Sequence, residues 1–244
     1  MKISTKLLVC GMCKAPEKWN TTILPTPYRL YYIKGGSAFF RLGNEEFKLE
    51  KNHFYLFPSS LPFIIRQDPS DRLDHLYYNF IMSPTLVSSE PICANINDHC
   101  LFPQFLKIME ESVTTYKTTL SREDKDIACG ILEAFLTLLT SIKPIAKVQN
   151  SDVSKSIAYM EANYMKEITI GEIAEKLFLS EDYFIRKFKK AMGMTPYSYL
   201  LRLRLSVANE LKKGGMSLSK VAEATGFKYA SSLSHALNKN SGWK

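Results

Sequence analysis

The sequence predicts an α+β protein of two domains: an N-terminal β-barrel with helices after it, and a C-terminal all-α domain with two helix-turn-helix units. Three observations support this fold class. Short aromatic and β-branched segments alternate with turn residues in the first third of the chain. Amphipathic helical stripes follow, and one helix-turn-helix pattern then occurs twice near the C-terminus. A length of 244 residues also fits two domains.

The expected strands begin at Tyr28 and continue to about Met82. They are rich in Phe, Tyr, Ile and Leu, and Gly35-Gly36 and Gly43-Asn44 mark two of the turns between them. Many short strands with regular turns are typical of an all-β barrel or sandwich. The expected strands cover residues 29–34, 37–42, 47–49, 53–58, 63–66 and 75–80.

The last of these strands places His75, Tyr77 and Asn79 on one face, because successive side chains of a strand point to opposite sides. An imidazole, a phenol and an amide together are unusual for a plain core. The mouth of a barrel can hold a small ligand, so this face is a candidate pocket. The equally open alternative is that His75 and Tyr77 simply point to solvent.

Catalysis is not expected in the barrel. The four histidines His53, His75, His99 and His235 contain no pair two residues apart, as metal-dependent barrels of this kind use. Five cysteines at irregular spacing argue against a disulfide framework. Cys10 and Cys13 have the spacing of half a zinc site, but no second half with suitable spacing follows. The sequence therefore predicts no enzyme, no metal and no cofactor.

Two helices are expected after the barrel, over residues 102–116 and 124–142. The first has a stripe of Phe102, Phe105, Leu106, Met109 and Val113. The second has a stripe of Ile127, Ile131, Phe135, Leu138, Leu139 and Ile142. A polar, proline-containing linker follows, and Ser154 is expected to cap the next helix. The expected segments are a β-domain at 1–98, a helical segment at 99–142, a linker at 143–153 and the helix-turn-helix domain at 154–244.

The first helix-turn-helix unit begins with Thr169 and Glu172, which have the spacing of a capping box at a helix start. Ser180 is the N-cap expected for the second helix of the unit. Phe184 and Phe188, four residues apart, are expected to anchor this recognition helix inward. A helix with basic side chains outward suits a DNA major groove. The outward candidates are Asp182, Ile185, Arg186, Lys189 and Lys190.

A second unit follows 48 residues further on, with Ala222 in the place of Ala174 and matching intervals. Gly226 lies in its turn, where a glycine tolerates positive φ. Leu233 and Leu237 are expected to point inward. The outward candidates for DNA contact are Ser231, Ser234, His235 and Lys239. A long helix over 196–213 would join the units and present both recognition helices to one DNA face, about one turn apart.

The distribution of charged residues supports the division of the chain into two domains. Residues 151–244 contain 15 Lys and Arg against 9 Asp and Glu, a net +6, whereas residues 1–150 contain 17 against 15, a net +2. The excess lies where a phosphate-binding surface is needed. No apolar run is long enough to span a membrane, and the run near Cys10 is too short for a signal peptide, so a cytoplasmic location is expected.

The C-terminal ninety residues resemble the AraC/XylS family of bacterial transcription regulators. The resemblance rests on Ile173-Ala174, Ser180, Phe184, Phe188-Lys189, Gly193-Met194-Thr195-Pro196, Tyr199-Leu200, Arg202-Leu203-Arg204, Ala208, Leu211, Val221-Ala222, Gly226-Phe227 and Leu233. It implies that the outward residues of both recognition helices read DNA bases. Arg186 is the best candidate for a guanine contact, because a guanidinium can donate to O6 and N7 together.

The resemblance extends to the front of the chain, where the family commonly has a cupin-like sensor domain. It implies an effector, such as a sugar, in a pocket that includes Lys34, His75 and Tyr77. It also implies a homodimer, with the helix over 124–142 as the interface, and activation of transcription with RNA polymerase as partner. The chain departs from the family pattern at Phe178, where a glycine is common, and ends at Gly242-Trp243-Lys244 without the usual closing segment.

Two alternatives stay open at this stage. One is a cupin-type small-molecule-binding protein or enzyme whose helical tail binds DNA weakly. The other is a DNA-binding protein that acts without an effector. Because the second unit has small polar outward residues, we expect the first unit to carry most of the base recognition.

Overall fold

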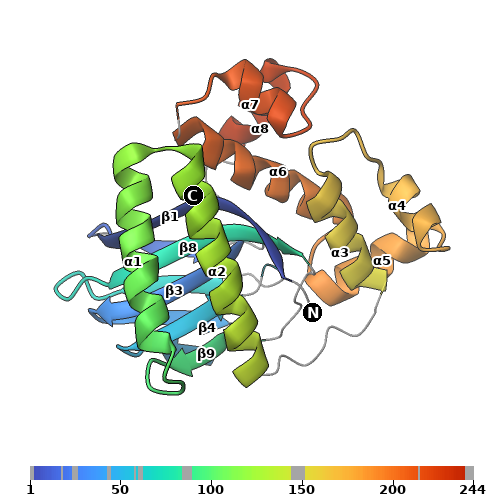
Figure 1. The fold of residues 1–244 in the computed structure, drawn as a ribbon. Helices are drawn as coiled ribbons and strands as arrows, with labels where there is room; N and C mark the ends of the chain where they lie inside the picture. Colours follow the sequence, from blue (N-terminus) through green and yellow to red (C-terminus); the bar gives the residue numbers. More distant parts are fainter. Residues whose placement is uncertain are drawn as a thin grey trace.

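The computed structural model describes residues 3–17, 19–23, 27–42, 45–57, 59, 63–83, 90–143, 152–213 and 215–239. Two antiparallel sheets form the N-terminal part (Figure 1). The five-stranded sheet has the order β1-β8-β3-β6-β9, and the four-stranded sheet has the order β2-β7-β4-β5. The strands are β1 (Ser4–Lys14), β2 (Asn20–Ile23), β3 (Tyr28–Gly35), β4 (Ala38–Leu42), β5 (Glu45–Lys48), β6 (His53–Phe57), β7 (Phe63–Gln67), β8 (Asp74–Ser83) and β9 (Ile92–Asn95).

Aromatic side chains fill the space between the two sheets. Tyr31, Tyr55 and Phe57 from the larger sheet meet Phe40 and Phe63 from the smaller one. Ring centroids there lie 4.4 to 6.4 Å apart, the range in which aromatic pairs attract one another. The N-terminal part is therefore a β-sandwich with an aromatic core.

Helices α1 (Phe102–Thr119) and α2 (Arg122–Ile142) cover the other face of the five-stranded sheet, as Figure 1 shows. Phe102 and Phe135 of the two helices pack on Phe54 of β6. The stripe expected for the first helix is confirmed, because all its members join this core. In the second helix the buried stripe is rotated, and Ile127 is 56% exposed.

All six strands expected from the sequence are present, whereas β1, β2 and β9 were not expected. Strand β1 was missed because Leu7, Leu8 and Cys10 form a continuous apolar run rather than an alternation. Leu7 and Cys10 face α1 and α2, and Leu8 packs against the C-terminal helices. Covering both faces of a strand removes the period-two pattern on which sequence analysis depends.

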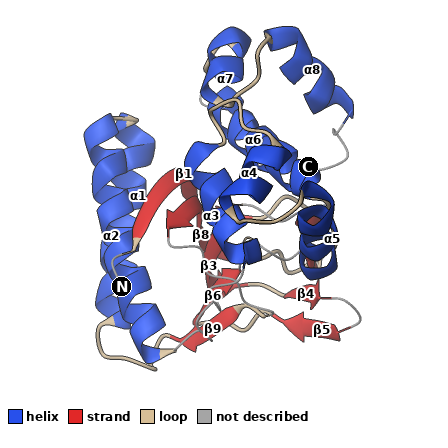
Figure 2. Ribbon diagram, turned by 90° about the vertical axis from the view of Figure 1, so that its right-hand side faces the viewer, coloured by secondary structure: helices blue, strands red, loops and turns tan. Residues whose placement is uncertain are grey.

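The C-terminal part is all-α, as expected. Its helices are α3 (Asp152–Asn163), α4 (Ile170–Lys176), α5 (Glu181–Met192), α6 (Pro196–Lys213), α7 (Leu218–Ala224) and α8 (Ala230–Lys239). Figure 2 shows α6 running between the pair α4 and α5 and the pair α7 and α8. Helix α3 begins before Ser154, so the cap expected at Ser154 is wrong, and this serine is buried inside the helix.

The capping box at the first unit is confirmed. The Glu172 amide donates to Thr169 Oγ1 at 3.1 Å, and the Thr169 amide donates to Glu172 Oε2 at 3.0 Å. Ser180 and Ser217 have the extended backbone of N-cap residues, but neither side chain accepts a capping hydrogen bond. The first helix of the first unit therefore has the better-defined start.

The turns of the two units share one backbone feature. Phe178 and Gly226 lie 48 residues apart and both have left-handed backbones, with φ of +57° and +74°. A residue with a side chain pays about 1–2 kcal/mol there, which explains why glycine is favoured at this place. The second turn is one residue longer than the first, so the expectation of matching intervals is wrong beyond it. Leu233 is buried 49 residues after Phe184.

The C-terminal helices pack on the sandwich. Ile81 of β8 joins the core of α3, α5 and α6, and Leu8 of β1 packs against that core. The described residues contain no helix with the length and apolar character that crossing a bilayer requires. The expected linker at 143–153 lies largely outside the described residues, as does the C-terminal Gly242-Trp243-Lys244.

Candidate functional site

Helix α5 has one buried face and one exposed face. Phe184 and Phe188 are fully buried, and the Phe188 ring contacts Tyr199 of α6 with a centroid separation of 5.7 Å. These contacts fix the rotation of α5 about its axis. The opposite side presents the expected side chains: Asp182, Arg186, Lys189 and Lys190 are exposed, and Ile185 is half-buried.

Arg186 lies near the middle of this exposed face. Within the described ranges, no acidic side chain forms an ion pair with it. Lys187 differs, because its ammonium donates to Asp152 of α3 at 2.6 Å. The basic charge that is available for DNA on α5 therefore comes from Arg186, Lys189 and Lys190.

Sequence reasoning missed Tyr183, which is 47% exposed beside Asp182 at the start of α5. The signal was present: a tyrosine one residue before the buried Phe184 and three before the outward Arg186 must lie near the outward face. Its phenol is a further group that can donate to a phosphate or contact a base.

Helix α8 presents a less charged face. Leu233 anchors it in a core with Val221 and Ala222 of α7, and Leu237 packs at the edge of that core. Outward, Ser231, His235 and Lys239 are exposed and Ser234 is half-buried. The four expected residues thus share one side of the helix, and only Lys239 is permanently charged.

The face of β8 with His75 and Tyr77 points into the sandwich and not to solvent. His75 is only 4% exposed. Its ring stacks on Trp19 with a centroid separation of 5.8 Å, and it lies 4.9 Å from Tyr31 and 5.5 Å from Tyr77. Tyr77 occupies the space under Gly11, where a Cβ atom would lie 2.6 Å from the phenol oxygen. The solvent-facing alternative is therefore wrong for His75, while Tyr77 is half-buried against the same core.

Two buried polar atoms on this strand face have no hydrogen-bond partner among the described residues: His75 Nδ1 and Asn79 Oδ1. Buried polar atoms are nearly always paired, so such atoms need an explanation. Burial lowers the pKa of His75 to about 4, against a smaller opposing effect of Asp74. The imidazole is therefore neutral near pH 7 and can accept or donate one further hydrogen bond.

Lys34 is separated from this group. It lies on the face of β3 that points toward α1, and its ammonium pairs with Glu110 at 2.8 Å. This ion pair raises the pKa of Lys34. The structure therefore brings His75 and Tyr77 together but places Lys34 on the opposite face of the sheet.

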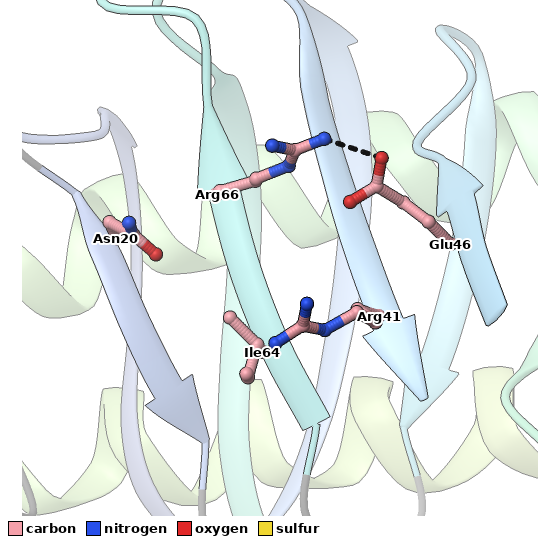
Figure 3. A pocket seen from close by; sticks show the side chains of 5 residues that line it. All are labelled: Asn20, Arg41, Glu46, Ile64 and Arg66. Atoms are coloured by element: carbon pink, nitrogen blue, oxygen red, sulfur yellow. Dashed lines mark hydrogen bonds and ion pairs between the residues drawn. The ribbon is translucent and has the colours of Figure 1, made fainter. Parts of the chain in front are cut away.

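A hollow also lies on the outer face of the four-stranded sheet. Figure 3 shows its lining residues, which come from all four strands: Asn20, Arg41, Glu46, Ile64 and Arg66. The Arg66 guanidinium pairs with Glu46 and lies 5.6 Å from the Phe39 ring. This hollow is on the far side of the smaller sheet from His75, so it is not part of the expected pocket.

Strand β8 connects the interior of the sandwich to the DNA-binding part. The face that carries His75 and Tyr77 continues to Ile81, which packs among the C-terminal helices. Beside it, Glu161 of α3 is 7% exposed and accepts hydrogen bonds from Tyr199 of α6 at 3.1 Å and from Ser59 of the sandwich at 3.4 Å. The two domains thus share a buried carboxylate and an apolar contact.

A second polar contact joins the domains at β1. The Lys6 ammonium donates to the Tyr164 hydroxyl and lies 5.0 Å from the centre of its ring. In the part of the chain that the structure describes, no three His, Cys, Asp or Glu side chains are close enough to hold a metal ion.

The geometry defines a class of protein: a double helix-turn-helix domain packed on a β-sandwich. Residues 173–242 match the family model described as a helix-turn-helix domain, which is the AraC type. A probable transcriptional regulator, LumQ of Photobacterium leiognathi, is 38% identical over 82 residues, or 33% of each chain. This chain thus spans about a third of LumQ. The lactose operon transcription activator of Staphylococcus xylosus is 21% identical over 211 residues, covering 82% of this chain and 75% of that protein.

The fold as a whole is similar to a solved structure. ToxT from Vibrio cholerae superposes with a TM-score of 0.58 over 97% of this chain and 93% of that one, at 14% identity. The α+β two-domain fold class is thereby confirmed, and so is the resemblance to AraC-type transcriptional regulators. Residues 173–242 therefore form a helix-turn-helix domain of the AraC type.

We expect His75 to make stability depend on pH. Its pKa of about 4 in the folded chain lies below the ordinary 6.5, so folding favours the neutral ring. The associated stability is complete above pH 6.5 and is lost as the pH falls toward 4, by about 3 kcal/mol in total. Urea unfolding at several pH values measures this loss. His75→Gln should remove most of it, whereas the control His53→Gln should not. Equal pH dependence in all three proteins would contradict the assignment.

Proposed function

We propose that this protein is a sequence-specific DNA-binding regulator of transcription that responds to a small molecule bound in the N-terminal sandwich. It acts as an activator together with RNA polymerase, in the cytoplasm where promoter DNA lies. The observation that carries the proposal is the pair of recognition helices α5 and α8 on one connecting helix, with Arg186 exposed and without an ion-pair partner among the described residues. The family model and the operon-regulator relatives support it.

The two helices contribute differently to binding. Helix α5 offers three basic side chains, of which Arg186 can donate to O6 and N7 of one guanine. Helix α8 offers Ser231, Ser234 and His235 for neutral contacts and Lys239 for a phosphate. Base discrimination therefore resides mainly in α5.

Replacing Arg186 and Lys189 separately tests this assignment. Arg186→Ala should weaken the free energy of binding to the preferred duplex by about 1–3 kcal/mol, because a bidentate base contact is lost. It should also relax the preference at one base pair. Lys189→Ala should weaken binding to all duplexes alike and reduce the slope of log affinity against log salt by about one. Fluorescence anisotropy with duplexes selected by the wild-type chain from a randomised library measures both.

The matched control is Lys155→Ala, which removes an exposed lysine from α3, outside both recognition helices. It should leave base preference intact. If Arg186→Ala weakened binding equally on every sequence, Arg186 would be a phosphate contact. If the wild-type chain selected no duplex at low salt, the regulator proposal would be wrong.

We propose that the effector binds against His75 and Tyr77. His75 Nδ1 and Asn79 Oδ1, which have no partner among the described residues, can bond its polar groups, and the rings of Trp19 and Tyr31 can pack on its apolar faces. A sugar offers both kinds of surface. One similar ToxT structure is described as bound to an unsaturated fatty acid, so a carboxylic acid with an apolar chain is the other class to examine.

Trp19 makes effector binding measurable. The chain has two tryptophans, so Trp243→Phe leaves Trp19 as the one reporter. Titration with pentoses, hexoses and disaccharides, and separately with unsaturated fatty acids, should change Trp19 fluorescence for one class. His75→Gln should weaken that response roughly tenfold, because the loss of one buried hydrogen bond costs about 1–2 kcal/mol. An unchanged affinity in His75→Gln would place the effector elsewhere.

The same titration addresses the alternative of a cupin-type binding protein or enzyme. We propose that the effector is bound and released unchanged. Recovery of the ligand in its original form after prolonged incubation supports this reading, and conversion to a product would favour the enzyme.

We propose that α2 forms a homodimer interface. Its outward side carries Ile127, Gly130 and Ala134, which are exposed, and Ile127 is 56% exposed. Ile131 and Leu138 lie at the edge of this strip, where they are half-buried and pack against the core. An apolar strip on an outer helix is typical of an interaction surface. Its small residues Gly130 and Ala134 would let a second helix approach closely.

A charge in this strip should separate the subunits. Ile127→Asp should shift the protein from dimer to monomer in sedimentation velocity, because an unpaired carboxylate would be buried at the interface. Thr137→Asp, on an exposed neighbouring turn of the same helix, is the control. A wild-type chain that sediments as a monomer at all accessible concentrations would refute the dimer.

A further inference from the structure

Arg204 lies in the middle of α6, the helix that both helix-turn-helix units share. Its guanidinium is turned toward the segment between α3 and α4. Nε donates to the Tyr164 carbonyl at 2.9 Å, and a terminal nitrogen donates to the Lys166 carbonyl at 2.8 Å. These carbonyls follow the end of α3, where helix geometry leaves them without partners within the helix. One side chain therefore ties the connecting helix to the first unit at two points.

The second unit touches the same place. Gly226, in the turn between α7 and α8, lies so near that a Cβ atom on it would be 2.5 Å from the Tyr164 carbonyl oxygen and 3.1 Å from Arg204 Nε. Such a separation from backbone cannot be accommodated without movement. Its φ of +74° is a second reason for glycine. The turn of the second unit is thus in direct contact with the end of α3.

Tyr164, Lys166, Arg204 and Gly226 form what we call the inter-unit junction. It is well packed, because Tyr164 is 2% exposed and Arg204 is half-buried. The half-buried guanidinium donates to both carbonyl groups, and losing these acceptors would leave a partly desolvated charge without them. The junction therefore has one favoured geometry, in which α6, the α3–α4 segment and the α7–α8 turn are held together.

We propose that Arg204 is a positioning residue that sets the distance and rotation between the two recognition helices, and thereby the spacing of the two DNA half-sites that the protein accepts. The inference rests on the proposed DNA-binding function and goes beyond it. Arg204 needs no base contact for this role. The apolar core with Leu205 and Ala208 holds α7 and α8 on α6, and the junction joins them to the first unit as well.

The relative position of the two recognition helices determines which half-site spacing on the DNA can be bound. A shift of one base pair moves a half-site by about 3.4 Å along the axis and also rotates it around the helix. A rigid pair of recognition helices can therefore fit one spacing only. A loosened pair would bind several spacings, each with fewer well-formed contacts. The expected consequence of losing Arg204 is a loss of spacing preference rather than a uniform loss of affinity.

Selection from a library of randomised duplexes tests the proposal with the full-length chain. The wild-type protein should select two half-sites at one dominant spacing. Arg204→Ala should select the same half-sites over several spacings. On synthetic duplexes, its preference for the best spacing over a spacing changed by one base pair should fall roughly tenfold, the effect of losing one charged hydrogen bond. Binding to the α5 half-site alone should stay unchanged.

Two further variants make the experiment specific. Arg204→Lys keeps the charge but not the two-pronged geometry, so it should restore the spacing preference in part. Gly226→Ala disrupts the junction from the second unit, because the added Cβ atom would clash with the Tyr164 carbonyl oxygen. It should broaden the range of accepted half-site spacings as Arg204→Ala does. Asn209→Ala, an exposed residue on α6, is the control and should behave as the wild type. Circular dichroism melts verify that each variant is folded.

The outcomes are distinct. If a folded Arg204→Ala keeps the single spacing, the positioning role is overturned while the DNA-binding function stands. If it loses the isolated α5 half-site as well, Arg204 contributes to that contact and the positioning role is again overturned. If the wild-type chain selects no duplex at all, the proposed function and this inference both fall.

Discussion

The five-stranded sheet must be covered on both faces, and this constraint organises the molecule. Helices α1 and α2 cover one face. On the other face, the four-stranded sheet covers the part near His75, and the C-terminal helices cover the part near Leu8 and Ile81. The DNA-binding domain is therefore not merely tethered by a linker. It completes the burial of two strands of the β-sandwich, and exposing them would lose apolar contact area.

This shared burial gives a physical basis for communication between the domains. Strand β8 presents His75 and Tyr77 to the sandwich interior and Ile81 to the DNA-binding domain on one face. Strand β1, its neighbour, presents Gly11 to Tyr77 and Lys6 to Tyr164. A ligand that moves Tyr77 would displace β8, which carries it, and β1, which it contacts at Gly11. The buried carboxylate of Glu161 limits how the domains can separate, because opening would break its hydrogen bond from Ser59 of the sandwich.

Much of the architecture follows from local sequence patterns. The capping box at Thr169 and Glu172, the paired Phe184 and Phe188, and the proline at the start of α6 each specify structure over a few residues, and each is present in the fold. The outward side of α5 then follows from helical geometry alone. The strands in which apolar and polar residues alternate could equally be predicted from the sequence. The interval between Phe184 and Leu233 could not be predicted, because a one-residue difference in the length of a turn does not change the helical periodicity on either side of it.

The sequence by itself determined the two-domain α+β class, the two helix-turn-helix units and the residues that face outward from them, since these depend on spacing along one element. Only the tertiary structure decided where elements far apart in the chain meet. It placed His75 inside the sandwich, turned Lys34 toward Glu110 on α1, and packed β1 between α1 and α2 on one face and the C-terminal helices on the other. It also brought Arg204, Tyr164 and Gly226 together. Such contacts depend on packing in three dimensions, which no local pattern encodes.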